Sequence, residues 1–257
     1  MSGHKITAMN QSKGFSLIEL AIAIFVITLL LGGLLVPLSS QVEQRQISDT
    51  RKYLEEIKEA LIGFAVANGR LPCPASSTSA GIADPPTPGA CPNFEGFLPW
   101  ATLNVAQGGD AWGNRFRYRV ASEFTNTPLS DGTCVVGDGR LGLCDNGNIT
   151  VNTRNSTTKA TQAIANNVVA LILSHGRNGY GATSTDNALR APVPGANVDE
   201  AANVDLNATF VYRTPSGVSS PCSDTAPGQP FCEFDDIVTW VSAYTIFNRM
   251  VAAGRLP

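Results

Sequence analysis

The chain has 257 residues, of which 43% are hydrophobic and 15% are charged, and its formal net charge is −3. This length suits one core with an appended segment, and the net charge argues against a nucleic-acid partner held by phosphate contacts. Only two histidines are present, one of them His4, which leaves little material for zinc binding or histidine-based catalysis. Six cysteines lie after residue 70, and this even number indicates disulfides formed in an oxidising compartment.

The first forty residues consist of a short polar leader and a long apolar run. Residues 1–14 include Lys5 and Lys13 but no acidic residue, and residues 20–38 carry no charge. A helix of that length can cross the hydrocarbon core of a bilayer, with the cationic leader on the cytoplasmic side. A secretory signal would be cleaved after its apolar stretch, whereas the small residue at this polar–apolar junction, Gly14, precedes it.

The junction reads Lys13-Gly14-Phe15-Ser16-Leu17-Ile18-Glu19. This motif resembles the processing site of type IV prepilins and type II secretion pseudopilins. The resemblance implies that a prepilin peptidase cleaves after Gly14 and that Phe15, the new first residue, is N-methylated. It also implies a bacterial inner-membrane protein with one span and a cytoplasmic N-terminus, which later enters a periplasmic or extracellular filament.

Glu19 is an acidic residue at the start of an apolar segment, where a charge costs roughly 2.5–3.5 kcal/mol on insertion scales. The resemblance supplies a partner, the N-terminal amine of Phe15 on a neighbouring subunit, and this pairing would set the axial register. The alternative is an acid near the cytoplasmic membrane face that reaches into the headgroups. Because the whole motif is present, we expect the assembly role.

The helix is expected to continue to residue 68 and to become amphipathic, with a stop at Asn68-Gly69. Its second half places apolar residues on one face and charged pairs on the others. The expected organisation is a leader over 1–14, a helix over 15–68 with a transmembrane and filament-core part over 15–38, and a globular head over 69–257. The apolar face consists of Ile47, Leu54, Ile57, Leu61 and Phe64.

The head contains all six cysteines, and neighbouring cysteines flank loops rich in glycine, proline or serine. Several pairings are open for six cysteines, and we expect neighbour pairing because each bridge then pins one long loop. Without a CxxC motif, a metal–thiolate cluster is not expected. The expected bridges are Cys73–Cys91, Cys134–Cys144 and Cys222–Cys232.

The head is expected to have the α+β class, with an antiparallel sheet packed on the long helix. Residues 115–120 alternate basic and apolar side chains, which predicts a strand with one buried and one wet face. Ser242 can cap a last helix that ends before Gly254. The other predicted strands cover 168–173, 208–212 and 237–241, and the inward residues of the last helix are Ile246, Phe247, Met250 and Val251.

Three head segments resemble parts of type II secretion major pseudopilins. The segment over residues 110–118 is similar to their Asp-x-Trp-Gly-x-x-Phe/Tyr-x-Tyr segment, and residues 174–179 are similar to a later turn. Asp235-Asp236-Ile237 resembles the Asp-Ile that closes their calcium loop, which implies a calcium ion held by Asp235, Asp236 and the Asn178 region. The alternative is a charged turn, because an insertion over 180–234 separates these points.

We therefore expect a filament subunit rather than an enzyme. No cofactor is expected to be required, and the calcium ion implied by the resemblance is the one candidate. The resemblance implies four partners: a prepilin peptidase, copies of the chain and other pilins or pseudopilins, an inner-membrane assembly platform, and the membrane. The pseudopilin-like turns favour a secretion pseudopilus, whereas the large cysteine-rich head favours a pilus component. The alternative class is a membrane-tethered periplasmic enzyme or ligand-binding domain, for which the apolar helix is only an anchor.

Overall fold

The computed structural model describes residues 14, 16–86, 91–106, 108–125, 141–217 and 220–256, with only the backbone of residues 31–38. The chain divides into two compact units, residues 1–45 and 46–257. One helix, α1 (Leu17–Asn68), runs through the boundary between them. The predicted leader apart from Gly14, and the predicted methylation site Phe15, lie outside the described residues.

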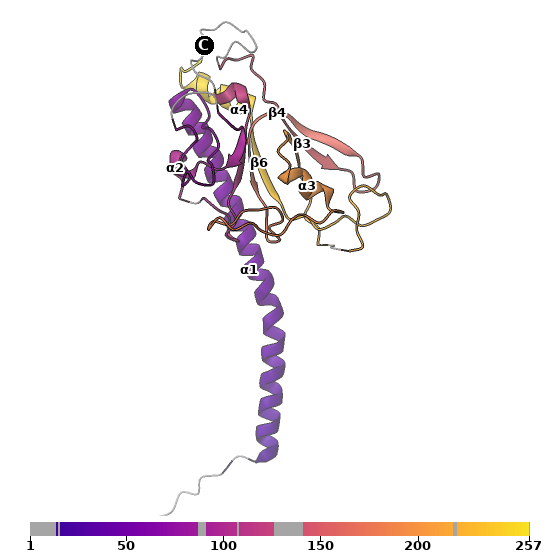
Figure 1. Ribbon diagram of the computed structural model, residues 1–257. Helices are drawn as coiled ribbons and strands as arrows, with labels where there is room; N and C mark the ends of the chain where they lie inside the picture. The colour runs from indigo at the N-terminus through magenta and orange to yellow at the C-terminus, as the bar shows by residue number, and fades with distance from the viewer. Residues whose placement is uncertain are drawn as a thin grey trace, which may run out of the picture. The chain divides into compact units, whose positions relative to one another are not determined.

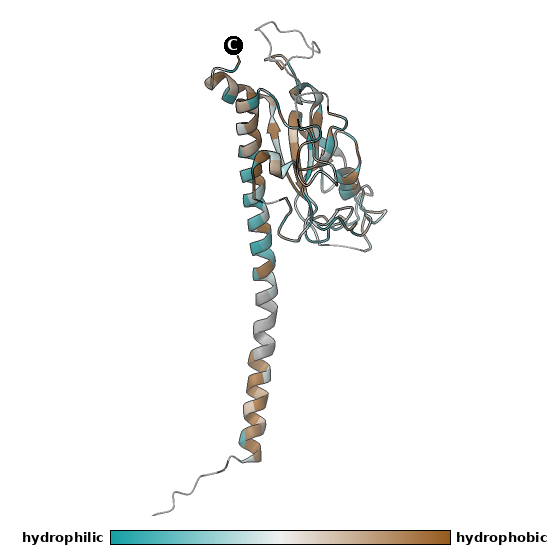
Figure 2. Ribbon diagram, turned by 60° about the vertical axis from the view of Figure 1, so that its left-hand side comes forward, coloured by the Kyte–Doolittle hydropathy of each residue, from teal (hydrophilic) through white to brown (hydrophobic). Residues whose placement is uncertain are grey.

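The first unit holds the N-terminal part of α1, and residues 17–30 of this part are almost all apolar (Figure 2). Four consecutive residues, 24–27, are all exposed, and four residues complete one helical turn. Within the described ranges, none of the helices combines the length and the apolar character that crossing a bilayer requires. The predicted span over 15–38 also includes Phe15 and the side chains of residues 31–38, which are not described.

In the second unit, α1 buries one face and ends at Asn68, the predicted end. Leu54, Ile57 and Leu61 are almost fully buried, as the helical spacing predicts. Gly69 follows with a φ of 70°, a left-handed conformation that glycine adopts at helix ends without strain. The sequence pattern therefore predicted both the packed face and the end of this helix.

The second unit contains a six-stranded mixed sheet, with strand order β1-β2-β4-β3-β5 and with β6 paired to β4. The α+β class is confirmed. Of the five strand pairs, four are antiparallel, as expected, but β3 and β5 pair in parallel. The crossover between β3 and β5 contains β4 and α3 (Val198–Val204), and it returns the chain in the direction of β3. The strands are β1 (Glu95–Phe97), β2 (Arg117–Val120), β3 (Ile149–Arg154), β4 (Thr161–Ser174), β5 (Thr209–Val211) and β6 (Ile237–Ser242).

Both faces of the sheet carry a hydrophobic core. One core joins the sheet to α1 and to α4 (Ala243–Ala252), and the second joins β3, β4, β5 and β6 on the opposite face. In Figure 1, α1 and α4 lie on the same side of the sheet. One face of β2 was predicted to contact water, and the structure covers part of it. Arg117 and Arg119 on this face are mostly buried, and both pair with Glu95. The insertion over 180–234 supplies β5 and α3, and this explains why the second face is not open to water.

The last helix follows its prediction at the start but not at every inward position. Ser242 is the N-cap of α4, and its hydroxyl accepts a hydrogen bond from the Thr245 N–H. Met250 is fully buried, but Val251 is 46% exposed, so its predicted inward position is wrong. Each residue advances about 100° around a helix, which turns Val251 away from the face that Met250 occupies. Two short helices, α2 (Trp100–Leu103) and the 3₁₀ helix η1 (Ser122–Thr125), complete the unit.

Two of the three expected disulfides are present in the described residues. Cys73 bonds to Cys91, and Cys222 bonds to Cys232. Cys144 is also in a disulfide, while its expected partner Cys134 lies outside the described residues. The third pairing therefore stays a prediction.

Candidate functional site

The N-terminal motif forms a reciprocal cap at the start of α1. The Ser16 N–H donates to Glu19 Oε2 at 3.2 Å, and the Glu19 N–H donates to Ser16 Oγ at 3.2 Å. This arrangement is a capping box, in which a serine and the glutamate three residues later satisfy one another's free backbone N–H groups. The sequence pattern Ser-x-x-Glu could have predicted this cap, which neither of the two roles expected for Glu19 includes.

The cap holds the Glu19 carboxylate at the helix N-terminus, where the helix dipole favours negative charge. Gly14, the residue before the predicted cleavage bond, is exposed.

The head contains a compact group of three carboxylates. Glu200 of α3, Asp235 and Asp236 each place a carboxylate oxygen within 4.8 Å of the others. Asp235 and Asp236 immediately precede β6, and Glu200 comes from the insertion. The predicted calcium residues Asp235, Asp236 and Asn178 are thus brought together, and Glu200 joins them.

Asn178 links two of the three acids. Its side chain donates to Glu200 Oε1 at 2.9 Å, and its backbone N–H donates to Asp235 Oδ2 at 2.8 Å. The second oxygen of Asp235, Oδ1, is buried and has no hydrogen-bond partner within the described residues. Calcium binds carboxylate and carbonyl oxygens in irregular shells, so an unpartnered carboxylate oxygen beside two further acids fits such an ion.

Burial and mutual repulsion disfavour the charged forms of these acids. Burial, together with the negative charge of Asp236, raises the pKa of Glu200 to about 8. Burial is also the main cause that raises the pKa of Asp235 to about 7, and the charge of Asp236 adds to it. Near neutral pH, these carboxyl groups therefore either keep their protons or are stabilised as carboxylates by a bound cation.

His175 lies beside this group and is completely buried. Its Nδ1 is 3.6 Å from Asp236 Oδ1, and neither ring nitrogen makes a hydrogen bond with the described residues. Ser174, the residue before His175, donates its hydroxyl hydrogen to Asp110 Oδ2 at 2.7 Å. The two segments predicted from the resemblance, around Asp110 and Ser174, therefore meet directly.

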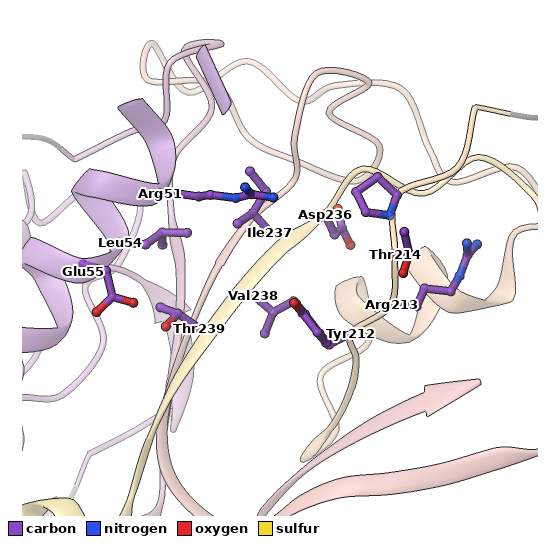
Figure 3. Close-up of a pocket in the computed structure, with 11 residues that line it drawn as sticks. Arg51, Leu54, Glu55, Tyr212, Arg213, Thr214, Asp236, Ile237, Val238 and Thr239 are labelled. Carbon is purple, nitrogen blue, oxygen red and sulfur yellow. The ribbon is translucent and has the colours of Figure 1, made fainter. Parts of the chain in front are cut away.

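A pocket of about 620 Å³ opens beside the acidic group (Figure 3). It is lined by Arg51, Leu54 and Glu55 of α1, by residues 212–215, and by residues 236–239. Asp236 belongs both to the pocket lining and to the acidic group. In Figure 3, α1 and residues 212–215 lie on opposite sides of β6.

Two site residues of the insertion were missed by the sequence reasoning. Glu200 lies in an Asn-x-x-Glu segment, in which Asn197 Oδ1 accepts from the Glu200 N–H and Asn197 Nδ2 donates to Glu200 Oε2. Asn203, one turn later, donates to Asp236 Oδ2 at 2.7 Å. The capping pattern could have predicted a helix at residue 198, but only the folded chain places this helix against residue 236.

Residues 9–35 match a family model described as the prokaryotic N-terminal methylation motif, the signature of type IV pilins and pseudopilins. No curated protein matches the chain, and no solved structure matches it. The matched range contains the predicted cleavage bond, Glu19 and most of the apolar part of α1. The resemblance of the N-terminal motif is thereby confirmed.

Proposed function

We propose that the chain is a structural subunit of a type IV pilus-like filament or a type II secretion pseudopilus. The match of residues 9–35 to the N-terminal methylation motif carries this proposal. A prepilin peptidase cleaves after Gly14, and Phe15 becomes the methylated first residue. The chain then acts by assembling with copies of itself and other pilins or pseudopilins, not by catalysis.

The exposed apolar part of α1 supports a role in assembly. From Leu17 to Leu30 the large apolar side chains are exposed, and a helix that is apolar all round requires burial in lipid or protein. We propose that the inner membrane covers this segment in the precursor, with the N-terminus cytoplasmic. Neighbouring helices would cover it in a periplasmic or extracellular filament after an assembly platform has extracted the subunit.

Glu19 is proposed to set the axial register of the filament. The Ser16–Glu19 cap holds the Glu19 carboxylate at the start of α1. In the filament this carboxylate would pair with the amine of Phe15 on the next subunit. A subunit shifted along the axis would leave both charges unpaired in apolar surroundings, which is costly.

Mass spectrometry of the mature N-terminus tests the processing step. Cleavage after Gly14 with a methyl group on Phe15 supports the filament subunit. An intact Met1 would contradict it and would favour a tethered periplasmic enzyme or ligand-binding domain.

The substitution Glu19→Val tests the register role in the producing cell. We expect processing to continue and incorporation into filaments to be lost. Glu56→Val is the matched control, because Glu56 is an exposed acid of the same helix outside the methylation motif. Normal incorporation of the Glu19 variant would refute the register role.

We also propose that the head binds calcium through Glu200, Asp235 and Asp236, with Asn178 orienting two of them. The unpartnered Asp235 Oδ1 is the observation that favours this site. Calorimetric titration of the full chain in detergent with calcium chloride should show binding that Asp235→Asn weakens and Glu59→Gln leaves unchanged. If the unsubstituted chain releases no heat and gains no thermal stability, the group is a protonated turn instead.

A further inference from the structure

The pocket in Figure 3 has no role in the function proposed above. Its volume of about 620 Å³ lies within the range of about 300–1,000 Å³ that is typical of small-molecule sites. Residues of α1 line one part of it, and residues 212–215 and 236–239 line the rest. All of these residues belong to the second unit, so the pocket lies within one compact part of the chain.

Apolar groups supply much of the pocket lining. Tyr212 adds an aromatic ring that is 44% exposed and that meets the Trp240 ring edge to face, with 5.7 Å between the ring centroids. The aliphatic and proline residues of the lining are Leu54, Pro215, Ile237 and Val238. An apolar ligand body gains free energy when it displaces water from such surfaces.

Arg51 is the charged group that the pocket offers to a ligand. Among the other charged residues of the lining, the side chains of Arg213 and Asp236 are only 4% and 1% exposed. Glu55 is exposed, but it forms an ion pair with Lys58 of the same helix at 3.4 Å. Arg51 is also exposed, and it forms no hydrogen bond or ion pair with the described residues. In Figure 3 its side chain extends from α1 toward β6.

Three hydroxyl groups line the pocket together with Arg51. They belong to Tyr212, Thr214 and Thr239, and within the described ranges these side chains form no hydrogen bond. A guanidinium has N–H donors and no acceptor, and each hydroxyl can donate one hydrogen bond. These donors fit a negatively charged group with oxygen acceptors, and a carboxylate matches a guanidinium through two parallel hydrogen bonds.

We propose that this pocket binds a small organic carboxylate with an aromatic or branched aliphatic body. The body lies against the Tyr212 ring and the aliphatic lining, and the carboxylate pairs with the Arg51 guanidinium. A carboxylate is favoured over a phosphate, because one guanidinium balances one negative charge and the nearby Glu55 repels a second. Such binding goes beyond the proposed filament role, since the whole pocket lies in the second unit of one chain.

Two probes of nearly equal shape test the need for a negative charge. Phenylacetate carries a carboxylate, and phenylacetamide carries a neutral amide in its place. Each is titrated into the full chain in detergent with ¹³C-labelled tyrosine, and the NMR signal of the Tyr212 ring is followed. We expect saturable binding of phenylacetate, about tenfold tighter than that of phenylacetamide, because hydrogen bonds to charged groups are the stronger ones. Equal affinities, or no saturable shift with phenylacetate, would overturn the proposal.

The substitution Arg51→Gln removes the guanidinium from an exposed position of α1. It should weaken phenylacetate binding about tenfold and leave phenylacetamide binding unchanged. Arg45→Gln is the matched control, because Arg45 is an exposed arginine of the same helix that does not line the pocket. Unchanged binding of phenylacetate by the Arg51 variant would refute the role of Arg51.

A blocking substitution tests the location. Thr214→Trp places an indole in the pocket and should abolish the binding of both probes, whereas Thr157→Trp, at an exposed position outside the pocket, should not. Thermal unfolding checks that both variants are folded. Unchanged phenylacetate binding by a folded Thr214 variant would place the probe elsewhere and overturn the proposal. None of these measurements depends on cleavage after Gly14, so the pocket and the filament function can fail separately.

Discussion

The N-terminal and C-terminal parts of α1 belong to one continuous helix, but they differ in where their apolar side chains lie. Residues 17–30 expose apolar side chains on every side, whereas Leu54, Ile57 and Leu61 are buried against the sheet and α4. The second part therefore contributes to the stability of its own chain. The first part makes no comparable contribution in the isolated chain, and its side chains are available for lipid or for other subunits.

The largest expected effect comes from replacing a leucine by alanine in each of the two parts of α1. Leu61→Ala removes fully buried methyl groups and should lower the free energy of unfolding of the second unit by about 2–5 kcal/mol. Leu29→Ala, at a residue that is 64% exposed, should leave that free energy unchanged. Denaturant unfolding of both full-length variants in detergent measures this difference. Equal losses would show that the first part also stabilises the head.

The reverse experiment places a charge in the first part. Leu29→Asp should disfavour membrane insertion by roughly 2.5–3.5 kcal/mol, because a carboxylate loses its hydration in hydrocarbon. We expect less precursor in the membrane fraction and no incorporation into filaments, while the thermal unfolding of the second unit stays unchanged. Normal membrane levels of this variant would contradict the proposed span.

A pH dependence is expected for the second unit alone. Glu200 and Asp235 have pKa values of about 8 and about 7 in the folded chain, against ordinary values of 4.5 and 3.8. The folded state therefore binds more protons than the unfolded state between about pH 4 and pH 8, and stability falls as pH rises through that range. Thermal unfolding at several pH values without calcium measures the slope, which Glu200→Gln should reduce. A flat profile for the unsubstituted chain would rule out this linkage.

The smallest effect concerns the two serine caps. Ser242→Ala removes the hydroxyl that accepts from the Thr245 N–H and should cost the second unit about 1 kcal/mol. Ser16→Ala removes the corresponding hydroxyl at the start of α1 and should leave the unfolding of the second unit unchanged. Thermal unfolding of the two variants provides the comparison. A loss of stability in both would show that the start of α1 also stabilises the second unit.

Sequence reasoning predicted local features well and long-range packing less well. The buried face of α1, its end at Asn68 and the Ser242 cap follow from spacing and cap chemistry over a few residues. The parallel β3–β5 pair and the covered second face of the sheet depend on where the insertion over 180–234 returns. Nothing in the local pattern of that insertion encodes its position.

The acidic group shows the same division. Asp235 and Asp236 were predicted from their resemblance to a calcium loop, and Asn178 from a turn before the insertion. Glu200 was missed, because its contact with Asp235 joins segments 35 residues apart through the fold. The capping pattern around residue 197 predicts a helix start, but not the neighbour that this helix meets.

The sequence by itself determined the processing motif, the apolar helix and its amphipathic continuation, because each depends on residue types at short, regular spacing. Only the tertiary structure decided which acids share a site, which sheet face is covered and which residues line the pocket. These features depend on contacts between segments distant in the chain, and such contacts are selected by the packing of the whole unit rather than by any one segment.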